Sequence, residues 1–193
     1  RRQRQMCIRD RCKLSIDGSI WLTKNYCNST MDWFHGVLGS DHKVCLSLYT
    51  LGGDLIGYQY RNLNGKEPKY ISQFFDQRDR GSAAWFVHVC AVDDLVITED
   101  YLSAYRVWQD TPFQSVALLR TSLTDKTLMQ IVDANPKRIR IWLDPDDAGK
   151  GGAKKVYSQL HHFMPADCEI TVLSLNKEPK QCTTAELQAI LSK

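Results

Sequence analysis

The second half of the sequence, from Asp93 onward, repeats a short apolar run followed by a helical pattern of apolar positions. Short runs of β-branched and apolar residues are typical of buried strands, whereas apolar positions three and four apart are typical of helices. The predicted strands are 95–98, 115–119, 139–143 and 170–175, and the predicted helices are 101–109, 125–132, 148–163 and 184–191. Strand-then-helix units joined by short links predict a parallel sheet flanked by helices, which is an α/β fold.

The helix predicted after Gly149 separates its apolar and polar side chains onto opposite faces. Its apolar face carries Ala153, Val156, Tyr157, Leu160 and Phe163. This pattern predicts a helix that covers one face of the sheet. Thr183 and Glu186 have the spacing of a capping box, which predicts the start of the last helix.

The first half of the sequence has a different pattern. Runs 43–50 and 54–61 are β-rich and flank Leu51-Gly52-Gly53, whose glycines supply the positive φ that a hairpin turn needs. A further strand at 85–90 would complete an antiparallel or mixed sheet. Before these runs, the first forty residues are irregular, with Trp21, Trp33 and Phe34 as apolar anchors.

These patterns predict three segments and one fold class. Residues 1–43 form an irregular or helical segment, 44–92 a β-rich subdomain, and 93–193 the α/β domain. The fold class is therefore α/β, with a sheet of mainly parallel strands flanked by helices and preceded by a smaller mixed α+β segment.

Composition indicates how the chain folds and in which compartment it works. With 193 residues, 43% of them hydrophobic, the chain can bury a sizeable core without cross-links. Its seven cysteines are scattered and odd in number, and no signal peptide is recognisable, which favours a reducing cytoplasmic setting. No apolar run approaches the ~20 residues that cross a bilayer, so no membrane role is expected. Because the first residue is Arg1 rather than Met, we expect a fragment or a processed product.

The formal net charge of +3 is unevenly distributed, because basic residues gather at the start of the chain: Arg1, Arg2, Arg4, Arg9, Arg11 and Lys13. Such a run can contact phosphates, but a solvated and mobile terminus has the same composition. Charge alone therefore leaves both interpretations open.

Candidate chemistry lies where two predicted strands end. Glu99 follows one strand, and Asp144 and Asp146 follow another. Carboxyl ends of parallel strands meet at one edge of a sheet, and two acids separated by one residue of extended backbone point the same way. Such oxygen ligands suit Mg²⁺ or Mn²⁺ rather than zinc. The alternative is that these acids cap the helices that follow, where they accept backbone N–H bonds.

Taken together, strand-Glu99 and strand-Asp144-x-Asp146-x-x-Gly149 resemble the Toprim domain. That domain is shared by bacterial and phage primases, topoisomerases of types IA and II, and some nucleases. The resemblance covers residues 93–193 and implies a Toprim-type sheet.

Segments outside these acids resemble DnaG-type primases in particular. Gly57-Tyr-Gln-Tyr-Arg61 and Lys69-Tyr70 are similar to the stretch before Toprim in those enzymes. The predicted strand 115–119 with the Thr121-Ser122 turn after it, and the stretch Asn176-Lys177-Glu178-Pro179, also resemble primase motifs.

This resemblance implies a primase catalytic core, in a phage-like setting, that makes short RNA primers on a single-stranded DNA template by metal-dependent nucleotidyl transfer. The implied cofactor is Mg²⁺ or Mn²⁺, and the implied partners are the DNA template, NTPs and a replicative helicase. For a phage-encoded enzyme, the setting is the host cytoplasm. The implied catalytic residues are Glu99, Asp144 and Asp146, which also bind metal together with Glu178. The implied nucleotide and DNA contacts are Arg61, Lys69, Thr121 and Ser122.

The sequence departs from the family pattern at several positions. Asp100 follows Glu99 where glycine is usual, Ser103 stands where an acid is often found, and Glu178 replaces an aspartate. These departures put a second metal site in doubt. Cys7-x4-Cys12 is either a remnant of the zinc ribbon that precedes such cores or a pair of ordinary cysteines.

Two other functions fit the same acids. One is a Toprim nuclease that activates water, although such nucleases do not need the segment 57–72. The other is a degenerate core that binds nucleic acid or a replication partner without catalysis.

Overall fold

A computed structural model describes residues 11–28, 32–88 and 92–192. The chain divides into two compact units, Arg1–Arg80 and Gly81–Lys193, which we call the first and second units. The first residues, including Cys7 of the cysteine pair, lie outside the described residues. The division into segments 1–43, 44–92 and 93–193 stays a prediction.

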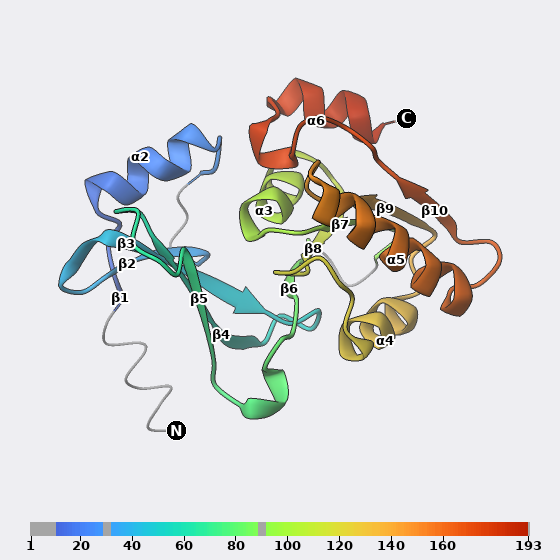
Figure 1. The fold of residues 1–193 in the computed structure, drawn as a ribbon, viewed down its shortest axis with the longest axis horizontal. Helices are drawn as coiled ribbons and strands as arrows, with labels where there is room; N and C mark the ends of the chain where they lie inside the picture. Colours follow the sequence, from blue (N-terminus) through green and yellow to red (C-terminus); the bar gives the residue numbers. More distant parts are fainter. Residues whose placement is uncertain (1–10, 29–31, 89–91, 193) are drawn as a thin grey trace. The chain divides into compact units, whose positions relative to one another are not determined.

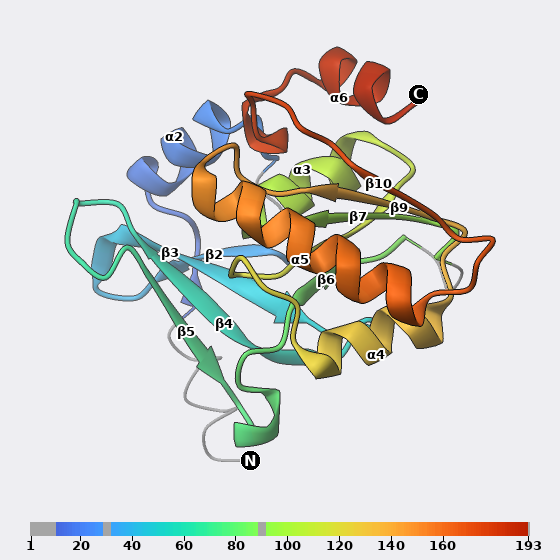
Figure 2. The ribbon, with the colours of Figure 1, turned by 45° about the vertical axis from the view of Figure 1, so that its right-hand side comes forward.

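The first unit is an antiparallel sheet with a helix packed beside it (Figure 1). Its strand order is β1-β2-β3-β4-β5. The strands are β1 (Arg11–Cys12), β2 (Phe34–Val37), β3 (Ser40–Tyr49), β4 (Leu55–Asn62) and β5 (Tyr70–Phe74). Helix α2 (Ile16–Lys24) packs against β3 (Figure 2), and a short 3₁₀ helix, η1 (Gln77–Asp79), follows the sheet.

The predicted hairpin is confirmed. β3 and β4 pair antiparallel, and the turn closes when the backbone N–H of Thr50 donates to the carbonyl of Asp54 at 2.9 Å. Gly53 takes a φ of +81°, the conformation that the turn requires. The preceding segment was expected to be irregular or helical, and α2 is the helix found there; β1 and β2 were not expected. Strands this short carry little periodic signal.

The second unit is a five-stranded sheet of order β10-β9-β7-β8-β6. Its strands are β6 (Ala84–Phe86), β7 (Asp94–Thr98), β8 (Gln114–Ala117), β9 (Arg138–Trp142) and β10 (Glu169–Val172). β7, β8, β9 and β10 are parallel, as predicted, and β6 is antiparallel to β8. The predicted α/β fold with a mainly parallel sheet is therefore confirmed.

The strand predicted at 85–90 needs a correction. β6 covers only Ala84–Phe86 and pairs with β8 in the second unit, not with the hairpin of the first. Trp85 and Phe86 are fully buried there, and a fully apolar strand of this kind carries no signal for its pairing partner. Residues 89 and 90 lie outside the described residues.

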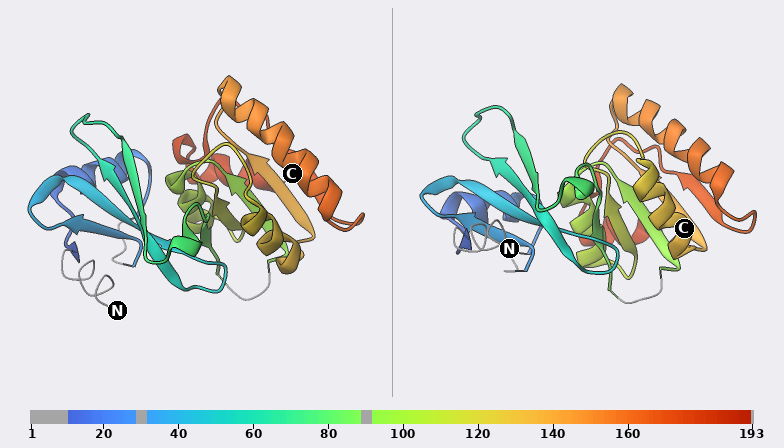
Figure 3. Two further views of the ribbon diagram at one scale, coloured as in Figure 1. Left: turned by 60° about the horizontal axis from the view of Figure 1, so that its bottom comes forward. Right: turned by 90° about the horizontal axis from the view of Figure 1, so that it is seen from below.

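Helices cover both faces of this sheet (Figure 3). α3 (Tyr101–Asp110) and α6 (Thr184–Leu191) pack together on one face, and α4 (Asp125–Ala134) and α5 (Asp147–Phe163) share the other. On the first face, Val96 and Trp142 are buried against Val107, Leu187 and Leu191. Among the described helices, none combines the length and the hydropathy that a bilayer crossing requires.

The cover helix and the last helix form as predicted, with one adjustment. Val156 and Leu160 of α5 are fully buried, but Tyr157 and Phe163 are exposed by 36% and 52%. The buried stripe therefore runs along Gly149, Gly152 and Ala153 to Leu160, and the two aromatic residues lie outside it. The capping box is confirmed, since Thr183 and Glu186 each accept from the other's backbone N–H.

Candidate metal centre

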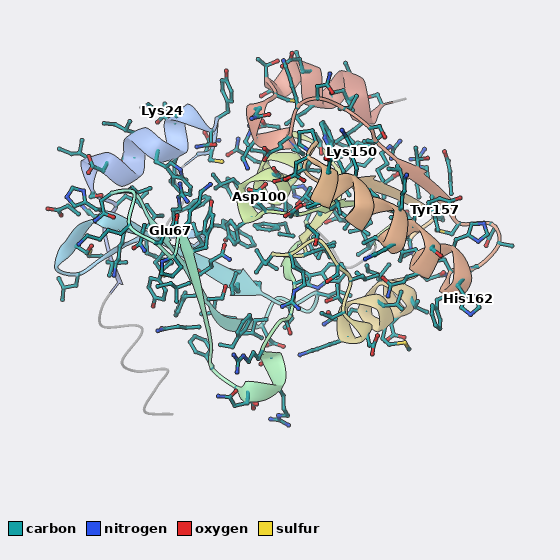
Figure 4. The ribbon with its side chains drawn as sticks, in the orientation of Figure 1. Lys24, Glu67, Asp100, Lys150, Tyr157 and His162 are labelled. Atoms are coloured by element: carbon teal, nitrogen blue, oxygen red, sulfur yellow. The ribbon has the colours of Figure 1, made fainter. Side chains whose placement is uncertain are left out.

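The parallel register brings the strand-end acids to one edge of the second unit. Thr98 of β7 pairs beside Trp142 of β9, so both strands end at the same level. Glu99 and Asp100 follow the first strand and Asp144 follows the second. Figure 4 shows Asp100 where α3 begins, with Lys150 in the first turn of α5. The sheet thus gathers acids from distant parts of the sequence, as predicted.

Two of these acids, Asp100 and Asp144, form a compact triad with Glu178. One carboxylate oxygen each from Asp100, Asp144 and Glu178 lies within 4.8 Å of the others. All three side chains are partly buried. Asp144 and Glu178 were expected at this site, whereas Asp100 was interpreted only as a departure from the glycine usual there. The sequence signal that could have identified Asp100 is its place directly after a strand and directly before a helix.

Asp100 serves two structural elements at once. Its Oδ1 caps α3 by accepting from the backbone N–H groups of Leu102 and Ser103, at 3.0 and 3.3 Å. Its Oδ2 lies 3.2 Å from the ammonium of Lys180. The cap fixes the carboxylate where the helix begins.

Glu99 lies in the field of the same acids. Its Oε2 is buried and accepts no hydrogen bond within the described residues. Burial, followed by repulsion from Asp146 and Asp100, raises the pKa of Glu99 above its ordinary value. A buried carboxylate oxygen without a donor is a position where a cation would be stabilising.

Asp144 is the most strongly perturbed acid of the site. Burial, together with repulsion from Glu178, Glu99 and Asp100, raises its pKa to about 7. A carboxyl group that ionises near neutrality in a cluster of acids is a feature of functional sites.

Lys180 is the cation that the triad holds. Its ammonium forms ion pairs with Asp100 and Glu178. Burial alone would lower the pKa of Lys180, but the two carboxylates outweigh burial and raise it. Sequence reasoning missed this residue, because only the folded chain brings position 180 to position 100.

Asp146 lies outside the triad and caps α5. Its Oδ1 accepts from the backbone N–H of Gly149 at 2.7 Å. The capping interpretation therefore applies to Asp146, although its charge also reaches Glu99. A share of Asp146 in metal binding stays a prediction.

The cap gives a direct stability test. We expect Asp146→Asn to be at least as stable as the wild type, because asparagine also caps helices and the charge near Glu99 is removed. Asp146→Ala should be about 1 kcal/mol less stable than Asp146→Asn, because both remove the charge but only alanine removes the cap. Urea unfolding of the two variants measures this difference. Equal midpoints would mean that the cap contributes nothing.

Two glycines let α5 begin tightly against this edge. A Cβ on Gly149 would lie 2.1 Å from the carbonyl oxygen of Asp144, and one on Gly152 would lie 2.3 Å from that of Thr121. No side chain fits at either position. The loop of Thr121 therefore touches the first turns of the helix that Asp146 caps.

That loop is tied to the acidic edge through its backbone. The N–H of Leu119 donates to the carbonyl of Glu99 at 2.8 Å, with Leu119 at a φ of 60°. Thr121 is partly buried and Ser122 is exposed. Their predicted contacts with nucleotide stay predictions.

Arg61 and Lys69 belong to the first unit, where Arg61 of β4 pairs beside Tyr70 of β5. The guanidinium of Arg61 lies 4.7 Å from the ring centre of Tyr70 and 5.9 Å from that of Trp21. Its Nε and Nη1 are buried and make no hydrogen bond within the described residues. Lys69 is exposed, with its ammonium 6.0 Å from the Tyr70 ring. The two predicted cations are therefore neighbours on one sheet.

Comparison with known proteins gives matches of structure only. No protein-family description matches the sequence, and no curated protein matches it. Among solved structures, the DnaG primase catalytic domain bound to single-stranded DNA aligns over 92% of this chain and 58% of its own, with a TM-score of 0.65 and 18% identity. This chain has the fold of a DNA primase catalytic core.

Two further structures with this primase fold come from a bacterium and a phage. The E. coli primase catalytic core aligns over 91% of this chain and 60% of its own, with a TM-score of 0.63 and 19% identity. The primase fragment of the bacteriophage T7 primase-helicase protein aligns over 86% of this chain and 65% of its own, with a TM-score of 0.57 and 16% identity.

The likeness confirms the predicted resemblance at the level of the primase fold. The chain spans a little over half the length of the first primase structures that it matches. At this identity the likeness shows the fold alone.

Proposed function

We propose that this chain is the catalytic core of a DNA primase, which joins ribonucleotides into short RNA primers on single-stranded DNA. The observation that carries the proposal is the acidic triad of Asp100, Asp144 and Glu178, at the carboxyl edge of a sheet with the primase fold. Related structures include a primase bound to single-stranded DNA and primase domains bound to an RNA/DNA hybrid. A phage setting and a helicase partner are part of the proposal, and the T7 primase-helicase fragment supports them.

The residues of the triad fit Mg²⁺ or Mn²⁺. They offer carboxylate oxygens only, which these hard cations prefer, and Glu99 adds a buried oxygen without a donor. Asp144 and Glu178 would hold the ion, with Asp100 as a further ligand and Asp146 and Glu99 beside it. When bound, the ion would polarise the phosphate and stabilise the charge of the leaving pyrophosphate.

The chain's own residues would supply the other requirements. Glu99 would accept the proton of the attacking 3′-hydroxyl, which its raised pKa makes more favourable near neutral pH. Thr121 and Ser122, on the loop beside the start of α5, would orient nucleotide phosphate with their hydroxyl groups. Positioning and electrostatic stabilisation supply most of the catalysis in reactions of this kind.

Arg61 would bind phosphate of the template or nucleotide. The aromatic rings of Trp21 and Tyr70 hold the plane of its guanidinium, so fewer rotamers are lost when a phosphate binds. A planar guanidinium can donate two parallel hydrogen bonds to the oxygens of a phosphate. Lys69, exposed in the adjacent position before Tyr70, would add a point charge.

One assay tests the proposal directly. The protein is incubated with single-stranded DNA, labelled NTPs and Mg²⁺ or Mn²⁺, and the products are separated by size. RNA oligomers that depend on both template and metal would support a primase. Shortened DNA would indicate the nuclease, and DNA binding without either product would indicate a core that binds without catalysis.

The proposed contact between Lys69 and a DNA phosphate can be tested by the salt dependence of binding. We expect Lys69→Ala to bind single-stranded DNA more weakly and to lower the salt slope of log Kd by about 0.7, the change for one phosphate contact on a single strand. Lys66→Ala is the matched control, because Lys66 is exposed in the same turn. Fluorescence anisotropy at several salt concentrations measures both. Equal slopes for the two variants would make Lys69 an ordinary surface charge.

A further inference from the structure

The Lys180 side chain is partly buried against the acidic triad and is ion-paired with two of its members. It lies in the short 3₁₀ helix η2 (Pro179–Gln181), directly after Glu178, and its side chain is only 21% exposed. Its ammonium forms ion pairs with Asp100 at 3.2 Å and with Glu178. Two of the three carboxylates that could hold a divalent cation are therefore already paired with one monovalent cation.

The backbone around Lys180 is held in place by other contacts. The amide of Gln181 reaches back to the N–H of Glu178 at 3.0 Å, which closes a capping box. The guanidinium of Arg106 donates to the carbonyl of Cys182 at 3.0 Å, and the indole N–H of Trp142 donates to that of Lys177 at 2.9 Å. The backbone at Glu178 is therefore held by contacts that do not involve the Lys180 side chain.

A fixed ammonium has two opposite effects on such a site. In the absence of metal it offsets the repulsion among Asp100, Asp144 and Glu178, which would otherwise destabilise the fold. In the presence of metal it competes, because a divalent cation and an ammonium that share carboxylates repel each other. The competition is strong, since the partly buried side chains are poorly screened by solvent.

We propose that Lys180 is an internal counter-cation that competes with the divalent ion for Asp100 and Glu178 and so weakens the ion's binding. This inference rests on the proposed metal site. It adds that metal occupancy in this chain is regulated by a lysine of the chain itself. An ion would then bind firmly only when the phosphates of a bound nucleotide supply further ligands and further negative charge.

The test measures Mn²⁺ binding directly, by the loss of the free-ion signal in electron paramagnetic resonance, without nucleotide. The variants are Lys180→Met, which keeps the length of the side chain, and Lys180→Arg, which keeps its charge. Lys177→Met is the matched control, because it removes the same charge three residues away, where the ammonium pairs with Glu186 outside the triad. Thermal unfolding with a chelator and with Mn²⁺ is followed in parallel.

We expect Lys180→Met to bind Mn²⁺ at least tenfold more tightly than the wild type, with Lys180→Arg and Lys177→Met within about threefold of it. Lys180→Met should also unfold at a lower temperature than the wild type in chelator and gain more from added Mn²⁺. Unchanged or weaker Mn²⁺ binding by a folded Lys180→Met, beside measurable binding by the wild type, would overturn this inference and leave the metal site standing. Absence of Mn²⁺ binding in every variant would overturn both.

Discussion

A protein carrying Asp144→Asn is expected to lose metal-dependent RNA synthesis by about 10³-fold, at the upper end of what removal of one electrostatic group costs. Burial and the neighbouring acids Glu178, Glu99 and Asp100 raise the pKa of Asp144 to about 7, and Asp144 is a member of the triad. Asparagine keeps the shape of the side chain and removes its charge, so a bound cation loses a ligand without a change in packing. Template-dependent primer synthesis measures the loss, and full turnover in the variant would remove Asp144 from the metal site.

The same variant should be more stable than the wild type without metal. Because the folded-state pKa of Asp144 is about 7 and the ordinary value is 3.8, its contribution to stability is complete below pH 3.8 and is lost as the pH rises toward 7. We therefore expect the thermal midpoint of the wild type in chelator to fall, relative to Asp144→Asn, between about pH 4 and 7. Scanning fluorimetry across this range tests the sign. Parallel curves for the two proteins would mean that Asp144 ionises as it does in the unfolded chain.

Glu99→Gln is expected to reduce primer synthesis by about 10²-fold or more while DNA binding persists. The glutamine retains the size of the side chain at the buried Oε2 position and cannot accept a proton. It also removes repulsion with Asp146 and Asp100, so the folded protein should not be destabilised. Initial rates at saturating template and NTPs separate this effect from weaker binding.

The control for Glu99→Gln is Glu186→Gln, which changes an acid to its amide in the capping box of α6, outside the triad. Its rate should stay close to that of the wild type. If Glu99→Gln also made primers at the wild-type rate, Glu99 would have no part in the chemistry and would only terminate a strand.

The parallel core of the second unit could be predicted because its signals are local. Each strand is an apolar run, each helix has an amphipathic period, and Thr183 with Glu186 marks a helix start by spacing alone. The approach of Glu99 and Asp144 followed from one general property of parallel sheets, that their carboxyl ends share an edge. These parts of the fold can be predicted without knowing which distant residues are in contact.

The other features of the fold and of the site could not be predicted, because they depend on contacts between residues far apart in the sequence. Lys180 pairs with Asp100 eighty positions earlier, and no local pattern indicates such a pair. β6 is apolar on both faces, so its sequence could not show that it joins β8 rather than the hairpin. Asp146 has the same sequence features whether it caps a helix or binds a cation, and its bond to Gly149 was visible only in the folded chain.

The close approach of α5 to the acidic edge also limits which side chains this chain can carry there. Gly149 and Gly152 face backbone carbonyl groups where any Cβ would collide, whereas a Cβ on Gly151 between them would meet nothing within 4 Å. Substitutions are therefore constrained at the outer two positions and free at the middle one. We therefore expect this chain to tolerate substitution at Gly151 but not at Gly149 or Gly152, because the contact between α5 and the acidic edge leaves no space for a Cβ there.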